Sequence, residues 1–468
     1  MGRSSRSEAG EPEPSALLTY PPTPGLDGVR TPLGALPVSP SHLLSSRPPH
    51  DCESPTVRST PKARRLLAAA AAAAALAGLC VTPASAQTAP AASGGTSAPA
   101  AAASTGHTLT PGTKFYIEGD SKAFAQALTD RRAGDTANAK LMDAMASYPV
   151  AQWFTGSTTL QQTTDAMGLL QAKAAPQQRV PVTVAYNVPG RDCSQYSAGG
   201  ASNSAEYAAW VDALAKGIGD RRTVVLLEPD GLALSPTFCG GTAEQQTTRL
   251  EEINDAVDRL GRQPGTAVYL DAGHSSWHAV GEIAQLLIDG GVSRAQGFFL
   301  NVSNYRTDSE LIRYGTQISQ CIWYLGNTEG AAPGDCPNQW WPAADADSWY
   351  ASHVPADARL THFVIDTSRN GKGPWTPTVS YPDAQDWCNP PGRGLGVRPT
   401  SQTGVPLLDA YLWVKVPGES DGSCTRGTAG PEDPEYGVVD PAAGAWWPDQ
   451  AHDLAARAVP ALTFNTNW

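Results

Sequence analysis

The chain has 468 residues and a formal net charge of −12. Residues 1–86 carry eight basic and six acidic side chains, so the part beyond residue 86 has a net charge of −14. This acidic balance argues against nucleic acids and anionic membranes as partners, and it suits a soluble protein that acts on a neutral substrate.

Three segments precede the predicted folded domain, residues 107–468, which holds all 13 tryptophans. Residues 1–56 are rich in Pro, Ser and Arg, and we expect a gene-model extension or a disordered segment. Residues 57–86 have a basic start, a short alanine-rich run and a closing Ala-Ser-Ala, which is typical of a secretory signal peptide. A membrane anchor would need about 20 strongly apolar residues. Residues 87–106 carry no charge and predict a flexible linker. The protein is therefore predicted to be secreted.

Six cysteines follow the predicted signal peptide, and an even number in an exported chain indicates disulfide bonds. Six cysteines permit fifteen pairings, and the sequence alone does not choose among them. The simplest pairing joins neighbours along the chain: Cys193–Cys239, Cys321–Cys336 and Cys388–Cys424. The chain beyond residue 86 has no C-x-x-C motif, which argues against the usual zinc and redox sites.

Short apolar runs alternate with stretches of helical periodicity. The runs that predict strands are 182–186, 224–227, 267–270, 297–300, 362–365 and 411–416. Helices are predicted from a cap at Asn203 to Gly219, and over 250–260 and 280–290. This alternation predicts an α/β fold with a parallel sheet of six to seven strands. Residues 321–360 and 425–444 are expected to form long inserted loops.

Carboxylates follow four of the predicted strands. Asp192 follows the first, Glu228 and Asp230 the second, Asp271 the third and Asp421 the last. Residues just beyond the strands of an α/β barrel line its active site, so these acids indicate acid–base chemistry on a sugar bond. Because residues two apart on a strand point the same way, Glu228 and Asp230 are both expected to face the barrel interior or its mouth. A single aspartate is more often a helix cap or a turn residue.

Seven blocks resemble those of glycoside hydrolase family six, in order from about residue 114 to the C-terminus. They are NVPGRDC (187–193), EPDGL (228–232), YLDAGH (269–274), NVSNY (301–305), DTSRNG (366–371), WCNP (387–390) and WVKVPGESDG (413–422). The resemblance implies a cellulase domain at 107–468, with the fold of a distorted, incompletely closed seven-stranded parallel β/α barrel. It implies inverting hydrolysis of β-1,4-glucan, in cellulose or cello-oligosaccharides, by a monomer without cofactor or metal.

The resemblance also assigns roles to single residues. Asp230 is implied to be the general acid, and Asp192 to support it and to handle the attacking water. Asp271 is implied to tune the electrostatics nearby, and Asp421 to be the base, either directly or through a water relay. The residues implied to bind the glucan are the platforms Trp153, Trp277 and Trp387, the ring contact Tyr186, the water ligand Ser197, and the hydroxyl partners His274, Asn301, Lys415 and Glu419.

The sequence argues against a zinc site and a serine esterase. His274 and His278 have the i, i+4 spacing of zinc helices but lack the glutamate of H-E-x-x-H, and no G-x-S-x-G motif indicates a serine esterase. A non-catalytic glucan-binding protein is disfavoured because all four aspartates are present. Within the family, endo action is favoured because the loop after Asp192 is compact. The long loop after Asp421 keeps an exo-acting cellobiohydrolase as the alternative.

Overall fold

The computed structural model describes residues 109–466. The predicted extension, signal peptide and linker lie outside the described residues. Within 109–466, no helix is both long enough and apolar enough to cross a membrane.

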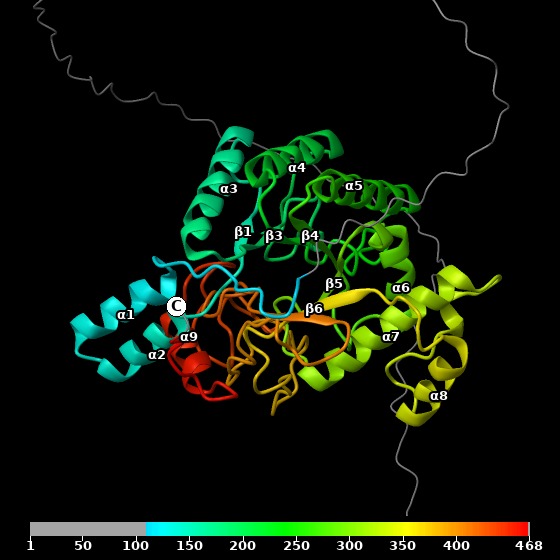
Figure 1. Cartoon of the computed structure of the whole chain (residues 1–468). Coiled ribbons are helices and arrows are strands. Elements are labelled where there is room, and N and C mark those ends of the chain that lie inside the picture. The colour runs from blue at the N-terminus through cyan, green and yellow to red at the C-terminus, as the bar shows by residue number, and fades with distance from the viewer. Residues whose placement is uncertain (1–108, 467–468) are drawn as a thin grey trace, which may run out of the picture. The chain divides into compact units, whose positions relative to one another are not determined.

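Seven parallel strands form one sheet in this part of the chain, in sequence order from β1 to β7 (Figure 1). The strands are β1 (Gln152–Phe154), β2 (Val182–Ala185), β3 (Thr223–Leu227), β4 (Thr266–Asp271), β5 (Gly297–Leu300), β6 (His362–Asp366) and β7 (Leu408–Leu412). Among the described residues no ladder joins β1 to β7, although the Ala151 amide donates to the Trp413 carbonyl at 2.9 Å. The predicted incompletely closed seven-stranded β/α barrel is confirmed.

Both faces of the sheet are buried, which explains why its strands appear as continuous apolar runs. Val224 and Leu226 of β3 point into an inner cluster together with Tyr269. Val225 and Leu227 alternate with them and pack in the cluster that contains the helices. The loops that follow β2 to β7 therefore begin at one edge of the sheet, next to its buried core.

Helices α3 to α7 cover the outer face of the sheet, and α1, α2 and α9 form a separate cluster with Trp413 (Figure 1). The helices are α1 (Lys122–Ala133), α2 (Thr136–Ala146), α3 (Leu160–Ala174), α4 (Ser204–Ile218), α5 (Ala243–Gly261), α6 (Val280–Asp289), α7 (Asp308–Asn327), α8 (Ala343–His353) and α9 (Pro448–Ala456). The predicted cap is confirmed, because the Asn203 side chain accepts from the Glu206 amide at 3.0 Å. The three neighbour disulfides are also confirmed.

The expected long loop at 321–360 is wrong in part. Cys321 lies inside α7, and α8 occupies residues 343–353. The sequence of α8 hides its helical periodicity, because the buried residues of this helix are only Ala346 and Tyr350. Residues 425–444 contain no helix or strand, as expected.

Candidate active site

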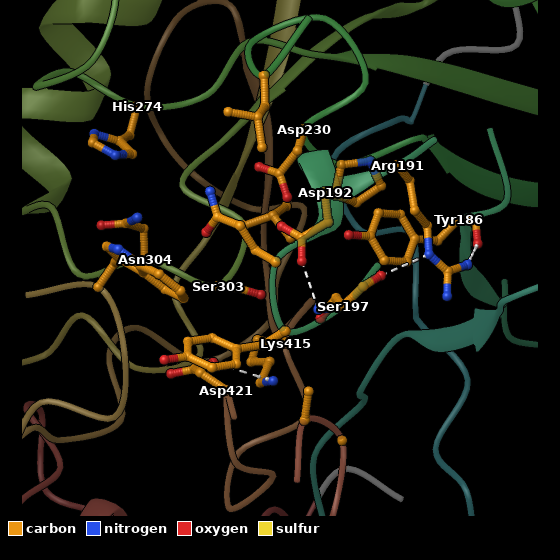
Figure 2. A pocket seen from close by; sticks show the side chains of 18 of the residues that line it. Tyr186, Arg191, Asp192, Ser197, Asp230, His274, Ser303, Asn304, Lys415 and Asp421 are labelled. Atoms are coloured by element: carbon orange, nitrogen blue, oxygen red, sulfur yellow. Dashed lines mark hydrogen bonds and ion pairs between the residues drawn. The ribbon is translucent and has the colours of Figure 1, made fainter. Parts of the chain in front are cut away.

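A cavity of about 720 Å³ opens where the loops leave the C-terminal ends of the strands. Eleven of the thirteen predicted site residues line it: Trp153, Tyr186, Asp192, Ser197, Asp230, His274, Trp277, Trp387, Lys415, Glu419 and Asp421. Asp271 and Asn301 do not belong to the lining. Figure 2 shows Asp230 and Asp192 near one another and Asp421 beside Lys415.

Asp230 is the half-buried carboxyl on the cavity wall just beyond β3. Burial raises its pKa well above the usual value, and the negative charges of Asp271 and Asp192 raise it further. A raised pKa favours the protonated form of Asp230, which is the form that a general acid needs.

Glu228 does not face the mouth of the barrel, which corrects the expectation from strand alternation. Its carboxylate is fully buried and accepts from the amides of Asn187 and Val188, at 2.8 and 2.9 Å. Burial raises its pKa to about 7. The alternation rule fails because the backbone at Glu228 is left-handed, with φ 53°. Glu228 thus fixes the loop that carries Asp192.

Asp192 lies in a loop held at several points. Its Oδ2 accepts from the Ser197 amide at 2.5 Å (Figure 2), and the next residue forms the Cys193–Cys239 disulfide. Burial raises the pKa of Asp192, while the Ser197 amide and the Arg191 charge act against this rise. The Arg191 guanidinium lies 4.5 Å from the ring centre of Tyr186, so it packs the loop against the aromatic wall.

Asp271 lies behind Asp230 rather than in the cavity. Its carboxylate accepts from the Ala233 amide at 2.9 Å and from the Gly273 amide at 3.1 Å. Burial raises its pKa, and these amides oppose the rise by stabilising the charged form. Asp271 therefore holds the turn after Asp230 and supplies a negative charge that, after burial, raises the pKa of Asp230.

Asp421 is a buried carboxylate between two cations. Its Oδ2 lies 2.8 Å from Nη1 of Arg369, and its Oδ1 lies 3.2 Å from Nζ of Lys415. Burial acts to raise its pKa, but the charges of Arg369 and Lys415 hold the pKa below its usual value. The Tyr305 hydroxyl, 3.4 Å away, and the Asn389 amide, 3.0 Å away, donate to the same Oδ2. Asp421 is thus fixed and ionised.

Asp366, at the end of β6, organises the site although the sequence analysis gave it no role. Its two carboxylate oxygens accept from the amides of Ser303, Ser368, Val414 and Lys415, at 2.9 to 3.1 Å. One buried acid thereby ties together the loops after β5, β6 and β7. The sequence does contain a signal for this role, because Asp366 directly follows the apolar run 362–365.

Asn301 does not fit the expected role as a hydroxyl partner. It is 1% exposed, and its amide donates to the Asp366 carbonyl at 2.8 Å. Its side-chain oxygen accepts from the Arg306 amide at 3.0 Å. Left-handed backbone at Asn301, with φ 71°, turns the side chain into the loop, where it supports the cavity wall from behind.

His274 lines the cavity as a neutral imidazole. Burial lowers its pKa to about 3. Its Nδ1 accepts from the Ser276 amide at 3.2 Å, so the ring proton is placed on Nε2. Lys415 and Glu419 also line the cavity, with partners of their own. Lys415 donates to the Ser420 carbonyl at 3.0 Å, and Glu419 pairs with Lys122 of α1 at 2.5 Å.

Three half-buried tryptophans line the cavity at separated positions: Trp153 on β1, Trp277 after β4 and Trp387 after β6. The Trp153 ring nitrogen donates to the Val414 carbonyl at 2.9 Å, and its ring meets Tyr186 edge to face at 5.5 Å. Trp387 packs 6.0 Å from Tyr196, a cavity residue that the sequence analysis missed. Rigid, partly exposed aromatic rings beside polar groups are suited to binding sugars.

The described residues offer one group with metal-ligand spacing, formed by Cys424, Asp433 and Asp440. The Cys424 sulfur is committed to the disulfide with Cys388. Asp433 forms a buried ion pair with Arg426 at 2.7 Å. This group is therefore a packed salt-bridge cluster by its chemistry, not a metal centre.

Comparison with known proteins agrees with this geometry. The profile described as "Glycosyl hydrolases family 6" matches residues 110–458. Endoglucanase 1 from a Streptomyces species (strain KSM-9) is 34% identical over 372 residues, which cover 78% of this chain and 90% of the relative. A probable 1,4-β-D-glucan cellobiohydrolase C from Aspergillus terreus is 32% identical, covering 68% of this chain and 69% of the relative.

Solved structures show the same fold. The endoglucanase Cel6 from Mycobacterium tuberculosis, solved with a thio-linked cello-oligosaccharide, is 34% identical and superposes with a TM-score of 0.58, covering 75% of this chain and 99% of that one. The endoglucanase CEL6B from Humicola insolens, at 23% identity and a TM-score of 0.56, covers 74% of this chain and 97% of that one and supports the fold alone. The extent of the profile match and of these alignments shows that the chain belongs to glycosyl hydrolase family 6.

Proposed function

We propose that the protein is a secreted, monomeric cellulase that cleaves internal bonds of β-1,4-glucan and inverts the anomeric configuration. The observation that carries this proposal is the place of Asp230, a carboxyl of raised pKa on the wall of a cavity that Asp192 and Asp421 also line. Family membership supports the same reaction.

The first step is protonation of the leaving group. Asp230 donates its proton to the glycosidic oxygen while the bond from that oxygen to the anomeric carbon breaks. General acid catalysis of this kind contributes about 10²–10⁴-fold to a rate. Burial, and then the charges of Asp271 and Asp192, raise the pKa of Asp230 and so favour its protonated form.

Water then attacks the anomeric carbon from the face opposite the leaving group. Inversion requires acid and base carboxyls about 6.5–9.5 Å apart, so that a water fits between the base and the sugar. Asp421 is fixed and ionised, but two neighbouring cations make it a weak base. We therefore assign Asp421 as the negative charge that orients the attacking water and receives its proton through a water relay. Asp192 and Ser197 support that water.

Substrate binding uses the aromatic residues of the cavity. Trp153, Trp277 and Trp387 offer partly exposed rings on which the apolar faces of glucose units stack. The Nε2 proton of His274 is available as a donor to a sugar hydroxyl, because Nδ1 already accepts from the protein. The absence of a net positive charge suits an uncharged polysaccharide.

Endo action is favoured by the bacterial relatives. Four of them, named endoglucanases, are 32–36% identical to this chain. The fungal relatives named probable cellobiohydrolases are 30–32% identical. The compact loop between Asp192 and α4 supports the same choice, since an exo enzyme needs long loops to roof its cleft.

The test compares viscosity loss with reducing-end release on a soluble cellulose derivative. We expect viscosity to fall steeply while few reducing ends have formed, since internal cuts shorten chains fastest. The Asp230→Ala variant is the control and should leave both readouts nearly unchanged. Reducing ends that accumulate with little loss of viscosity would show exo action. An inactive wild-type enzyme would refute the proposed function.

A further inference from the structure

Three large aromatic side chains that do not line the cavity are strongly exposed on two loops that contact the turn of Trp277. Phe238 is 56% exposed, Trp340 is 60% exposed and Trp341 is 45% exposed. Exposed apolar side chains that gather beside a binding site commonly mark an interaction surface. We call these three residues the aromatic extension.

Phe238 continues the aromatic surface of Trp277. The two ring centres lie 6.0 Å apart with an interplanar angle of 70°, and Phe238 also contacts the ring of His278 at 5.2 Å. Trp277 lines the cavity, whereas Phe238 is not part of the lining. The next residue, Cys239, is bonded to Cys193 beside Asp192. Phe238 therefore stands on a braced loop at the border of the cavity.

The segment that carries Trp340 and Trp341 is bonded to the turn that contains Trp277. The side-chain amide of Gln339 donates to the Ser275 carbonyl at 3.0 Å and to the His278 carbonyl at 2.9 Å, and these two residues flank Trp277. The segment is anchored upstream by the Cys321–Cys336 disulfide. A bond of 2.8 Å from the Tyr350 hydroxyl to the Pro337 carbonyl adds a further anchor.

Two separately braced loops that contact the turn of Trp277 thus carry exposed aromatic residues. We propose that the aromatic extension binds further glucose units of the glucan chain where that chain leaves the cavity past Trp277. This inference rests on the proposed function. The occupant is assigned from continuity with the cavity, because a polymer that stacks on Trp277 must run out over the adjoining surface.

The chemistry of the surroundings also fits a neutral sugar chain. Carboxylates of Glu282 and Asp347, with side chains 67% and 63% exposed, lie on the neighbouring helices α6 and α8. Asp347 is paired with Arg313 at 2.9 Å, so the exposed Glu282 is the charge here that disfavours an anionic membrane as the occupant. Sugars offer apolar ring faces to the aromatic residues and hydroxyls to nearby carboxylates.

The test measures kcat/KM on cello-oligosaccharides of increasing length. A double variant, Trp340→Ala with Trp341→Ala, removes most of the aromatic extension, and Phe238→Ala removes the rest. Leu169→Ala on α3, where Leu169 is 59% exposed, is the control for loss of an exposed apolar side chain. We expect the double variant to lose about three- to tenfold on the longest oligosaccharides and on the polymer. On the shortest oligosaccharide that is cleaved it should equal the control.

A second readout separates binding from turnover. In the inactive Asp230→Ala background, migration through a gel that contains a soluble glucan should be retarded less when the two tryptophans are absent. Replacing both by tyrosine should restore the retardation. If the double variant cleaves glucan and its kcat/KM changes with oligosaccharide length as that of Leu169→Ala does, the proposed role of the aromatic extension is wrong and the proposed function stands. A wild-type enzyme that cleaves no β-1,4-glucan would overturn the proposed function as well.

Discussion

Arg369 and Asp421 form a buried ion pair at the edge of the cavity, with 2.8 Å between Nη1 and Oδ2 and side-chain exposures of 1% and 5%. Arg369 also donates to the Ser303 carbonyl at 2.6 Å, and its guanidinium lies 4.6 Å from the ring centre of Tyr305. The proposed base is therefore held by a cation that is itself locked between two loops. Arg369 therefore both stabilises the ionised form of Asp421 and fixes the position of its carboxylate.

Replacing Arg369 by Met should weaken both stability and activity. Breaking a buried pair on one side costs about 3–5 kcal/mol, which urea unfolding would measure. The pKa of Asp421 is depressed in the folded enzyme, so its contribution to stability and its ionised state are lost as pH falls through that pKa. Without Arg369 the pKa rises, and the acid limb of kcat/KM should move to higher pH. An unmoved acid limb would show that Asp421 does not set it.

The two acids of the EPD segment should respond differently to substitution. Asp230→Ala should lower kcat about 10²–10⁴-fold while glucan binding persists. Glu228→Gln should instead lower the free energy of unfolding by about 1–3 kcal/mol, because it removes a buried carboxylate that accepts hydrogen bonds from two backbone amides. Thermal unfolding and kcat measured on both variants check this division. Near-normal turnover in Asp230→Ala would place the acid elsewhere.

The alkaline limb of the pH profile should report Asp230. Its pKa is raised by burial and by the charges of Asp271 and Asp192, so activity should fall as Asp230 ionises, at a pH above the usual range of an aspartate. Asp192→Asn removes one of those charges while its side-chain oxygen can still accept from the Ser197 amide. We expect the alkaline limb of kcat/KM to move to lower pH. A shift to higher pH would contradict the assignment.

The Cys193–Cys239 disulfide should matter for both stability and catalysis. Replacing both cysteines by Ser should cost about 2–5 kcal/mol and should also lower kcat, because Cys193 adjoins Asp192. The matched control replaces Cys321 and Cys336, which are adjacent in sequence to none of the four aspartates. That control should lose stability but keep its kcat on short oligosaccharides. Equal losses of kcat in both variants would argue against a role for the disulfide in placing Asp192.

The sequence predicts those parts of the fold in which side chains are buried on both faces. The strands β2 to β6 appear as apolar runs for this reason. The three residues of β1 are only half-buried, so this edge strand has no such signal. The sequence pattern does not predict the short helix α8, because only two of its side chains, Ala346 and Tyr350, are buried. Packing of exposed or edge elements is decided by the rest of the fold rather than by local pattern.

Strand alternation alone does not decide which acids reach the cavity, because Asp192 and Asp230, which line it, and Glu228, which does not, all have left-handed backbone. Left-handed residues at Glu228 and Asn301 redirect side chains that simple alternation sends into the cavity. The organising role of Asp366 and the ion pair of Arg369 depend on loops distant in sequence. Such contacts become visible only once the loops are placed.

The most direct test of the central claim is the configuration of the first product. The proposed mechanism places water, not a protein nucleophile, at the anomeric carbon opposite Asp230, so hydrolysis must invert that carbon. Proton NMR of a cello-oligosaccharide digest, recorded before mutarotation, reads the product directly. We predict that the α-anomer appears first. An initial β-anomer would contradict attack by water and would require a carboxylate nucleophile about 5–5.5 Å from the acid.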